Sequence, residues 1–195
     1  MKPLLTLMIT LCLLLGGAVA AAPTPYLLQS DRSEVGFIFQ INGTANRGTM
    51  PVMAAKIAID FDQFANSQVD VTLDASGART GLIFATEALK AASVLDVRNH
   101  PAIRFQSTAV RVANPRNLSQ GGQIDGLLTI RGVTRPVTLN VALFRQEGTA
   151  DGDLRQLSFR ISGTIRRGDF NAAGYADMVA DTIQLDIAAR VIRAQ

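Results

Sequence analysis

Cysteine is nearly absent from the sequence, since Cys12 is the only one among 195 residues. It lies in a hydrophobic run near the N-terminus, and Leu11 stands where a lipoprotein signal needs a small residue. If that run is removed on export, the mature chain has no thiol, which excludes disulfides, cysteine metal ligands and thiol nucleophiles. The fold must then be held together by its hydrophobic core alone.

Histidine is equally scarce, and His100 is the only one. A metal site normally combines several ligands with supporting groups behind them. A Ser-His-Asp triad would depend on the same residue, and the sequence has no G-x-S-x-G motif. We therefore interpret His100 as a turn residue before Pro101 and expect no metal, no cofactor and no enzyme activity. An enzyme that acts on an apolar substrate through His100 and a carboxylate is the alternative.

Tryptophan is absent and tyrosine occurs twice. Carboxylates at alternate positions, Asp60 with Asp62 and Asp70 with Asp74, could supply the pair that a glycosidase needs. No aromatic platform for a sugar accompanies them, so we interpret them as solvated charges on the polar faces of strands. Gly121 and Gly122 do not lead from a strand into a helix, and nucleotide chemistry has no support.

A large excess of either charge is also missing. Without Lys2 the chain carries 18 basic and 16 acidic residues, a net charge of +2, which is too balanced for a nucleic-acid-binding protein. We interpret the arginines near strand ends as mostly solvated, with the alternative that one or two mark the mouth of a cavity facing an anionic head group. These arginines are Arg131, Arg135, Arg145, Arg160, Arg166 and Arg167.

The N-terminus has the pattern of a secretory signal peptide. A short positive start is followed by the apolar run from Leu4 to Leu15 and by small residues up to Ala22. A membrane-spanning helix needs about 20 strongly apolar residues, whereas this run fades into glycine and alanine. We therefore expect residues 1–22 to be a signal peptide cleaved after Ala20 or Ala22, residues 23–195 to be one domain, and no membrane span after cleavage.

The dominant pattern of the mature chain is an alternation of apolar and polar residues, which is typical of strands with one buried face. Turn residues separate the runs, which indicates an antiparallel all-β domain of about eight strands, either a closed barrel or a two-sheet sandwich. The alternating apolar positions are Val35, Phe37, Phe39 and Ile41; Ile57, Ile59 and Phe61; Val69, Val71 and Leu73; Ile124, Gly126, Leu128 and Ile130; Val137, Leu139, Val141 and Leu143; Phe159, Ile161 and Ile165; and Ile183, Leu185, Ile187 and Val191.

Two connections have patterns of their own. The composition of Thr86 to Ser93 favours a short helix, with Thr86 as N-cap and Glu87 complementing the helix dipole. The segment TIRGVTRPVTLNV, Thr129 to Val141, predicts a hairpin whose tight connection is Gly132-Val133-Thr134. Residues 112–123 form a polar hairpin loop in this interpretation.

The order of several segments resembles the YceI-like family over roughly residues 26–194. The most specific blocks are D-V-x-x-x-P-x-I-x-F-x-S-T, from Asp96 to Thr108, and L-T-I-R-G-V-T-R-P-V, from Leu128 to Val137. The resemblance implies a lipocalin-like antiparallel β-barrel of about eight strands, with one short helix in a long excursion between strands. It also implies export to the bacterial periplasm and a polyisoprenoid chain, such as a quinone or its precursor, held inside the barrel by a protein without enzyme activity.

In such a barrel the apolar tail would dominate affinity. Each buried CH₂ contributes roughly 0.8 kcal/mol, so a five-carbon unit contributes on the order of 3–4 kcal/mol before binding costs. A periplasmic structural or stress-related domain with a filled core is the alternative. The residues expected to line the ligand cavity are Phe37, Phe39, Ile57, Ile59, Phe61, Val69, Val71, Leu73, Phe105, Leu128, Ile130, Val137, Leu139 and Val141.

Overall fold

The computed structural model describes residues 22–115, 117–144 and 152–195. Apart from Ala22, the expected signal peptide lies outside these residues, and so do Cys12 and Arg145. Among the helices of the described segments, none has the length and hydrophobicity needed to cross a membrane.

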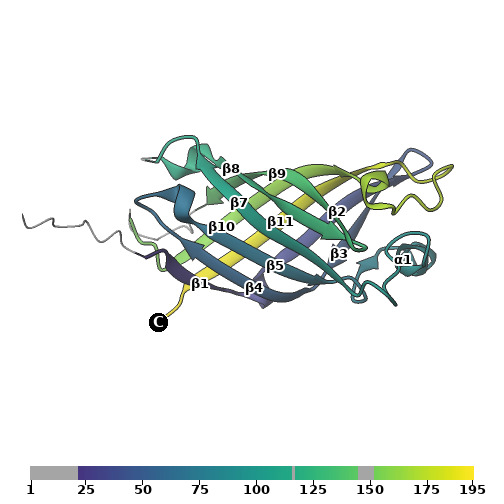
Figure 1. Cartoon of the computed structure of the whole chain (residues 1–195), viewed down its shortest axis with the longest axis horizontal. Coiled ribbons are helices and arrows are strands. Elements are labelled where there is room, and N and C mark those ends of the chain that lie inside the picture. Colours follow the sequence, from purple (N-terminus) through teal and green to yellow (C-terminus); the bar gives the residue numbers. More distant parts are fainter. Residues whose placement is uncertain (1–21, 116, 145–151) are drawn as a thin grey trace, which may run out of the picture.

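Antiparallel strands make up most of the described chain (Figure 1). A single α-helix, α1 (Ile83–Lys90), and four short 3₁₀ turns, Ser30–Arg32, Phe64–Asn66, Leu118–Gln120 and Arg167–Phe170, are described beside them. The strands are β1 (Thr24–Leu28), β2 (Glu34–Ile41), β3 (Thr44–Met50), β4 (Val52–Ile59), β5 (Gln68–Asp74), β6 (Arg79–Thr80), β7 (Ala102–Val112), β8 (Gly122–Ile130), β9 (Val133–Phe144), β10 (Gln156–Arg166) and β11 (Thr182–Arg193).

The sheet closes on itself as a barrel. The strand order is β1-β4-β5-β7-β8-β9-β10-β11-β2-β3-β6, and β1 also pairs with β11. Both β1 and β2 pair with β11, and β3 and β4 follow one another on either side of Pro51. Each of these pairs of strands shares one position around the wall. The two-residue β6 pairs with β3 on the side where β5 pairs with β4, so β5 and β6 share a third position, and the eleven strands occupy eight positions. The expected eight-stranded barrel is therefore confirmed, and closure leaves no long open edge.

Alternation of apolar and polar residues builds the wall. Along β8, Ile124, Gly126, Leu128 and Ile130 are buried, while Leu127 between them and Gln123 before them are exposed. Outward-facing charges pair across neighbouring strands, as Arg104 does with Asp70 and Arg160 with Asp186. Hydrogen bonds from Arg104 lower the pKa of Asp70. The two residues form an ion pair on the outer face, and Asp70 thus lies on the polar face of its strand, as the sequence indicated.

Asp60 differs from its expected role. Its side chain is buried at the end of β4, where the carboxylate accepts hydrogen bonds from the amides of Asp62 and Gln63 and from Asn66 Nδ2. The hydrogen bond from Gln63 contributes most to lowering the pKa of Asp60. The prediction of a solvated strand carboxylate was wrong here because the strand ends at Ile59, and Asp60 stabilises the turn that follows.

The helix begins and ends three residues earlier than predicted, and Thr86 lies inside it. Leu82 occupies the N-cap position without a side-chain cap. The Thr86 hydroxyl instead accepts a hydrogen bond from the Thr80 amide at 2.9 Å and lies 3.0 Å from the Thr80 hydroxyl. A tertiary contact with β6 has thus taken the side chain that sequence reasoning assigned to capping.

The connection between β8 and β9 is also shorter than predicted. It consists of Arg131 and Gly132, both with positive φ, of 51° and 74°, as a two-residue type I′ turn requires. Val133 and Thr134 already belong to β9, and the Thr134 and Thr129 hydroxyls lie 2.8 Å apart across the strands. Arg131 donates a hydrogen bond to the Asn171 carbonyl, so the turn is tied to the loop after Phe170.

Candidate functional site

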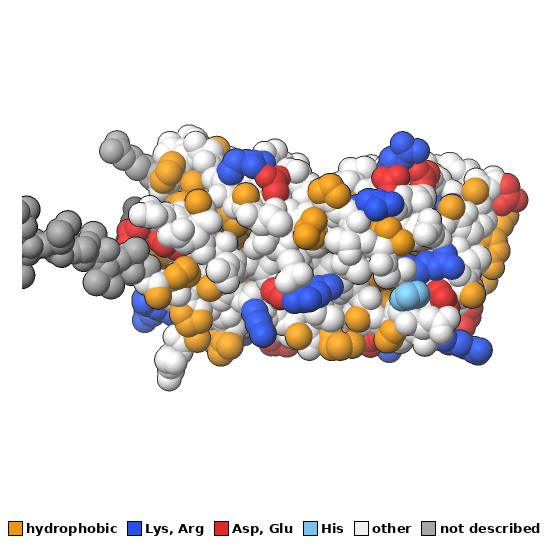
Figure 2. All heavy atoms as spheres, viewed as in Figure 1, with side chains coloured by type: hydrophobic (Ala, Val, Ile, Leu, Met, Phe, Trp, Pro, Cys, Tyr) orange, Lys and Arg blue, Asp and Glu red, His pale blue; other side chains and the backbone are white. Residues whose placement is uncertain are grey.

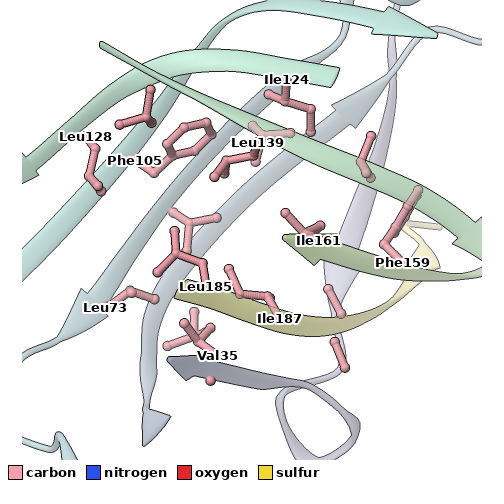
Figure 3. A pocket seen from close by; sticks show the side chains of 18 of the residues that line it. Val35, Leu73, Phe105, Ile124, Leu128, Leu139, Phe159, Ile161, Leu185 and Ile187 are labelled. Carbon is pink, nitrogen blue, oxygen red and sulfur yellow. The ribbon is translucent and has the colours of Figure 1, made fainter. Parts of the chain in front are cut away.

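A cavity of about 320 Å³ lies inside the barrel. Side chains from all eight wall positions line it, and Figure 3 shows labelled side chains from β2, β5, β7, β8, β9, β10 and β11 converging on the interior. The lining is almost wholly apolar, with Ser33, Ser67 and Arg167 as its only polar or charged side chains among the described residues. Such a space binds an elongated apolar molecule by burial and offers few groups for chemistry.

Most of the residues expected to line the ligand cavity lie on the wall of this cavity. Those that line the cavity are Phe37, Ile57, Ile59, Phe61, Val69, Val71, Leu73, Phe105, Leu128, Ile130, Val137, Leu139 and Val141. Phe39 does not line it, although it is buried on the same face of β2 as Phe37. Its ring lies 6.0 Å from the ring of Phe37, centre to centre. Alternation fixes the face of a strand on which a residue lies, but not its position along the barrel.

Sequence reasoning missed several lining residues that the same signal could have found. Phe159, Ile161 and Ile165 of β10 and Ile183, Leu185, Ile187 and Val191 of β11 all line the cavity. They belong to runs whose alternation was recognised, and they face inward for the same reason as the predicted residues.

A second group of missed residues closes one end of the cavity. Leu89 on α1, Val94 and Leu95 after it, and Phe170 and Ala172 from the loop after β10 all contribute to the lining. Leu89, Val94, Leu95 and Phe170 belong to one apolar cluster with Met50, Ile103 and Ile130. None of the end residues lies on an alternating strand, so only the tertiary structure brings them over the barrel. Tyr26, Leu143, Leu157 and Val191 form a separate cluster toward the other end.

Two inward-facing glycines make room for aromatic rings of the lining. A Cβ atom at Gly126 would lie 2.5 Å from the Phe105 ring, and one at Gly48 would lie 2.2 Å from the Phe37 ring. Atoms cannot approach so closely without displacement, so each glycine allows the ring on the neighbouring strand to lie flat against the wall. Gly48 and Gly126 therefore help to shape the cavity without supplying a side chain.

Arg167 is the one charged residue of the lining among the described residues, and the residue is only 7% exposed. Its guanidinium donates hydrogen bonds to the carbonyls of Ala172, Gly174, Val179 and Ala180, at 2.9, 2.5, 2.7 and 3.1 Å. Burial lowers the pKa of Arg167, and nearby Asp181 opposes that change. The carboxylate of Asp181 bonds Arg166 and the Gly168 amide instead. Arg167 therefore fastens the loop of residues 171–181 to the end of the barrel.

The other candidate arginines lie outside the cavity. Arg160 pairs with Asp186 and Arg166 with Asp181 on the outer surface, and Arg135 is exposed. Among the described members of the set, Arg167 alone reaches the cavity. It does so as a buried residue satisfied by backbone carbonyls and not as a solvated one.

His100 lies apart from the cavity, in the turn before β7. Its amide donates to the Asp96 carbonyl at 2.8 Å, and its ring lies beside Gly132 of the β8–β9 turn. The Asp96 carboxylate accepts from Asn99 Nδ2, and no described carboxylate pairs with the imidazole. The described residues also hold no group of three or more histidine, cysteine, aspartate or glutamate side chains able to bind a metal. The geometry thus matches a turn residue.

Two bacterial proteins illustrate the sequence similarity of this chain to known proteins. A UPF0312 protein of Pectobacterium carotovorum subsp. carotovorum is 31% identical over 138 residues, covering 70% of this chain and 69% of the relative. Protein YceI of Salmonella arizonae is 30% identical over 126 residues, covering 64% and 62% of the two chains.

Solved structures share the fold at lower identity. BcnA of Burkholderia cenocepacia superposes with a TM-score of 0.73 at 19% identity, covering 84% of this chain and 99% of BcnA. A domain of Saccharophagus degradans, described as polyisoprenoid binding and implicated in plant cell wall breakdown, gives a TM-score of 0.60 at 12% identity, with 88% and 99% covered. The YceI-like domain model matches residues 26–191, nearly the whole described barrel, and the chain therefore belongs to the YceI-like domain family.

Proposed function

We propose that this protein is an exported lipid-binding protein without enzyme activity, which holds the polyisoprenoid chain of a quinone or quinone precursor in its barrel. The observation that carries the proposal is the cavity of about 320 Å³, which is lined by apolar side chains from every wall position. Membership of the YceI-like family supports it, and so does the similar fold of the Saccharophagus degradans polyisoprenoid binding domain. Export to the periplasm through residues 1–22 is part of the proposal.

Binding would rest on burial of the tail. At roughly 0.8 kcal/mol per buried CH₂, a single isoprene unit gains on the order of 3–4 kcal/mol, whereas an exposed ion pair to a head group gains about 0–1 kcal/mol. Affinity should therefore follow the length of chain that the cavity can enclose, up to the point at which the cavity is full. Residues such as Phe105, Leu128 and Leu139 would contact the tail. A tail bound by burial needs few hydrogen-bonding groups, which agrees with the apolar lining.

Mass spectrometry of organic extracts from the natively expressed protein tests the proposal directly. We expect a prenyl lipid to co-purify, and the lipid-free protein to bind a long-chain isoprenoid quinone saturably in a fluorescence titration. Extracts without lipid, together with no saturable binding, would show that the apolar interior is only a packed core.

A pair of tryptophan variants locates the binding site. Ile161 lines the cavity, whereas Ser162 follows it on β10 and is exposed. Ile161→Trp fills part of the cavity and should weaken quinone binding at least tenfold, while Ser162→Trp should bind as the unaltered chain does. Because the sequence has no other tryptophan, each indole also reports whether the variant is folded. Equal binding by both variants would place the ligand outside the barrel.

A further inference from the structure

The start of α1 exposes three successive apolar residues at one end of the barrel. Ile83 is 86% exposed and Phe84 65% exposed, and Leu82 before them is also exposed. The same helix buries Ala85, and its Leu89 lines the cavity. One end of this short helix therefore contributes to the cavity wall, while its other end exposes an apolar tip to solvent. Such a tip lowers solubility and does not contribute to the core.

A second exposed apolar pair lies at the same end. Tyr175 and Met178 are exposed on the loop that Arg167 fastens to the barrel. That loop contacts the segment after α1, since the Gly174 amide donates to the Ser93 carbonyl at 2.9 Å. Figure 1 shows α1 and this loop at one end of the barrel, and Figure 2 shows hydrophobic side chains reaching the surface there.

The cations around the tip differ from those on the barrel wall. On the wall, Arg47, Arg104 and Arg111 each pair with a carboxylate on a neighbouring strand, Arg47 with Glu34 on β2. Arg79 just before the tip, Lys90 at the end of α1 and Arg98 beyond it form no ion pair with a described carboxylate. The acidic residues of this segment are Glu87 and Asp96, and Asp96 is held by Asn99. Within residues 79–98 the cations therefore outnumber the carboxylates by three to two. The loop that carries Tyr175 and Met178 adds Asp177, so this small excess of cations is confined to the α1 segment.

We propose that this end of the barrel, the α1 tip, docks on a bilayer surface with anionic head groups and there exchanges lipid between the membrane and the cavity. The tip is defined as Leu82, Ile83 and Phe84 with the flanking Arg79, Lys90 and Arg98. An apolar surface that enters the head-group region, surrounded by cations that meet anionic lipid, is the pattern of an interfacial membrane contact. The proposal rests on the proposed function, because it supplies the route by which a membrane lipid reaches the cavity.

Vesicle co-sedimentation of the mature chain tests the docking itself. We expect binding to vesicles that contain phosphatidylglycerol, at least tenfold weaker binding to pure phosphatidylcholine, and weakening by added salt because surface charges are screened. The variant Ile83→Ser/Phe84→Ser should lose at least tenfold in binding to the phosphatidylglycerol vesicles. Both positions are exposed, so the barrel should remain folded.

A matched control is available on the wall. Leu27 on β1 and Met53 on β4 are 57% and 59% exposed, and Leu27→Ser/Met53→Ser removes a similar apolar area away from α1. This control should bind vesicles within twofold of the unaltered chain. The proposal would be overturned if both variants lost binding equally, or if the unaltered chain did not bind vesicles. It would also be overturned by a concentration-dependent dimer that only the α1 variant abolishes, because the tip would then contact a second copy of the chain.

Lipid transfer separates this proposal from the proposed function. In the α1 variant, uptake of an isoprenoid quinone from phosphatidylglycerol vesicles should slow at least tenfold, while equilibrium binding of the quinone from detergent solution stays unchanged. A protein that binds vesicles but no quinone would refute the proposed function while leaving the docking surface intact. A protein that binds quinone but takes it up equally fast in both serine variants would refute the docking proposal alone.

Discussion

Replacing Arg167 tests the interpretation of this residue as the fastener of the cavity end. Arg167→Met keeps much of the side-chain length but removes the donors that satisfy the carbonyls of Ala172, Gly174, Val179 and Ala180. A buried acceptor left without a donor costs about 1–3 kcal/mol, and not every carbonyl will find water. Removal of a buried cation regains part of its desolvation cost, which offsets some of this loss. We expect a net destabilisation of about 3–5 kcal/mol.

Arg166→Met is the control, since Arg166 is exposed and forms one ion pair with Asp181. Surface pairs of this kind contribute about 0–1 kcal/mol, so the control should unfold nearly as the unaltered chain does. Urea unfolding measures both free energies. In a thermal melt, each kcal/mol corresponds to about 2–4 °C for a domain of this size, so Arg167→Met should melt about 6–20 °C lower.

The comparison has a clear negative outcome. If Arg167→Met costs no more than Arg166→Met, the four hydrogen bonds do not hold the loop of residues 171–181, and the end of the cavity must be closed by apolar packing alone. Proteolysis gives a second measure of the same point. The loop of the Arg167 variant should be cut before the barrel unfolds, and a cleavage pattern identical to that of the control would contradict the role of Arg167.

Two further predictions concern the wall and the surface. Gly126→Ala should lower the free energy of unfolding in urea by about 1–3 kcal/mol, because a Cβ would meet the Phe105 ring and the Gln106 carbonyl at 2.5 Å. The control Gly81→Ala has open space around it and should change this free energy by no more than about 0.5 kcal/mol. Equal losses in the two variants would show that the Phe105 ring moves freely. Hydrogen bonds from Arg155 lower the pKa of Asp153 to about 2, so its stabilising contribution is present above the ordinary value of 3.8 and is lost as the pH falls toward 2. An NMR titration should show this low value. Arg155→Ala should raise the pKa of Asp153 part of the way toward 3.8, because the backbone amide of residue 155 still donates to the carboxylate; an unshifted Asp153 would exclude the pair.

Sequence reasoning predicted the antiparallel all-β class because the physical cause of that class is local. An inward face of Val137, Leu139 and Val141 against polar neighbours must be buried on one side of a sheet, but alternation left a closed barrel and a two-sheet sandwich open. The resemblance to the YceI-like family implied the barrel, and the structure confirms it. By the same alternation, most of the predicted residues lie on the wall of the cavity. The prediction failed at Phe39 because burial on the inner face does not reveal how far along the barrel the cavity extends.

Predictions from local sequence were wrong for two polar side chains that could bind more than one partner. Thr86 has the chemistry of an N-cap, yet its hydroxyl bonds Thr80, and the helix begins earlier with Leu82 as a cap without a side-chain hydrogen bond. Asp60 was read as a solvated carboxylate, yet it lies buried and binds the amides of the turn after β4. The partner of Thr86 is brought close only by folding, whereas Asp60 binds amides two and three residues further on, a local turn that spacing could have indicated.

The sequence by itself determined the all-β class, the inward face of each alternating strand and the absence of a recognisable catalytic constellation, because these depend on periodicity and composition. Only the tertiary structure decided how the barrel ends are closed. Leu89, Val94 and Phe170 come from non-strand segments without a periodic signal, and Arg167 is buried by a loop whose carbonyls it binds. The exposed tip at Ile83 and Phe84 belongs to the same category, since an apolar residue reveals its exposure to solvent only when the rest of the chain has folded around the cavity.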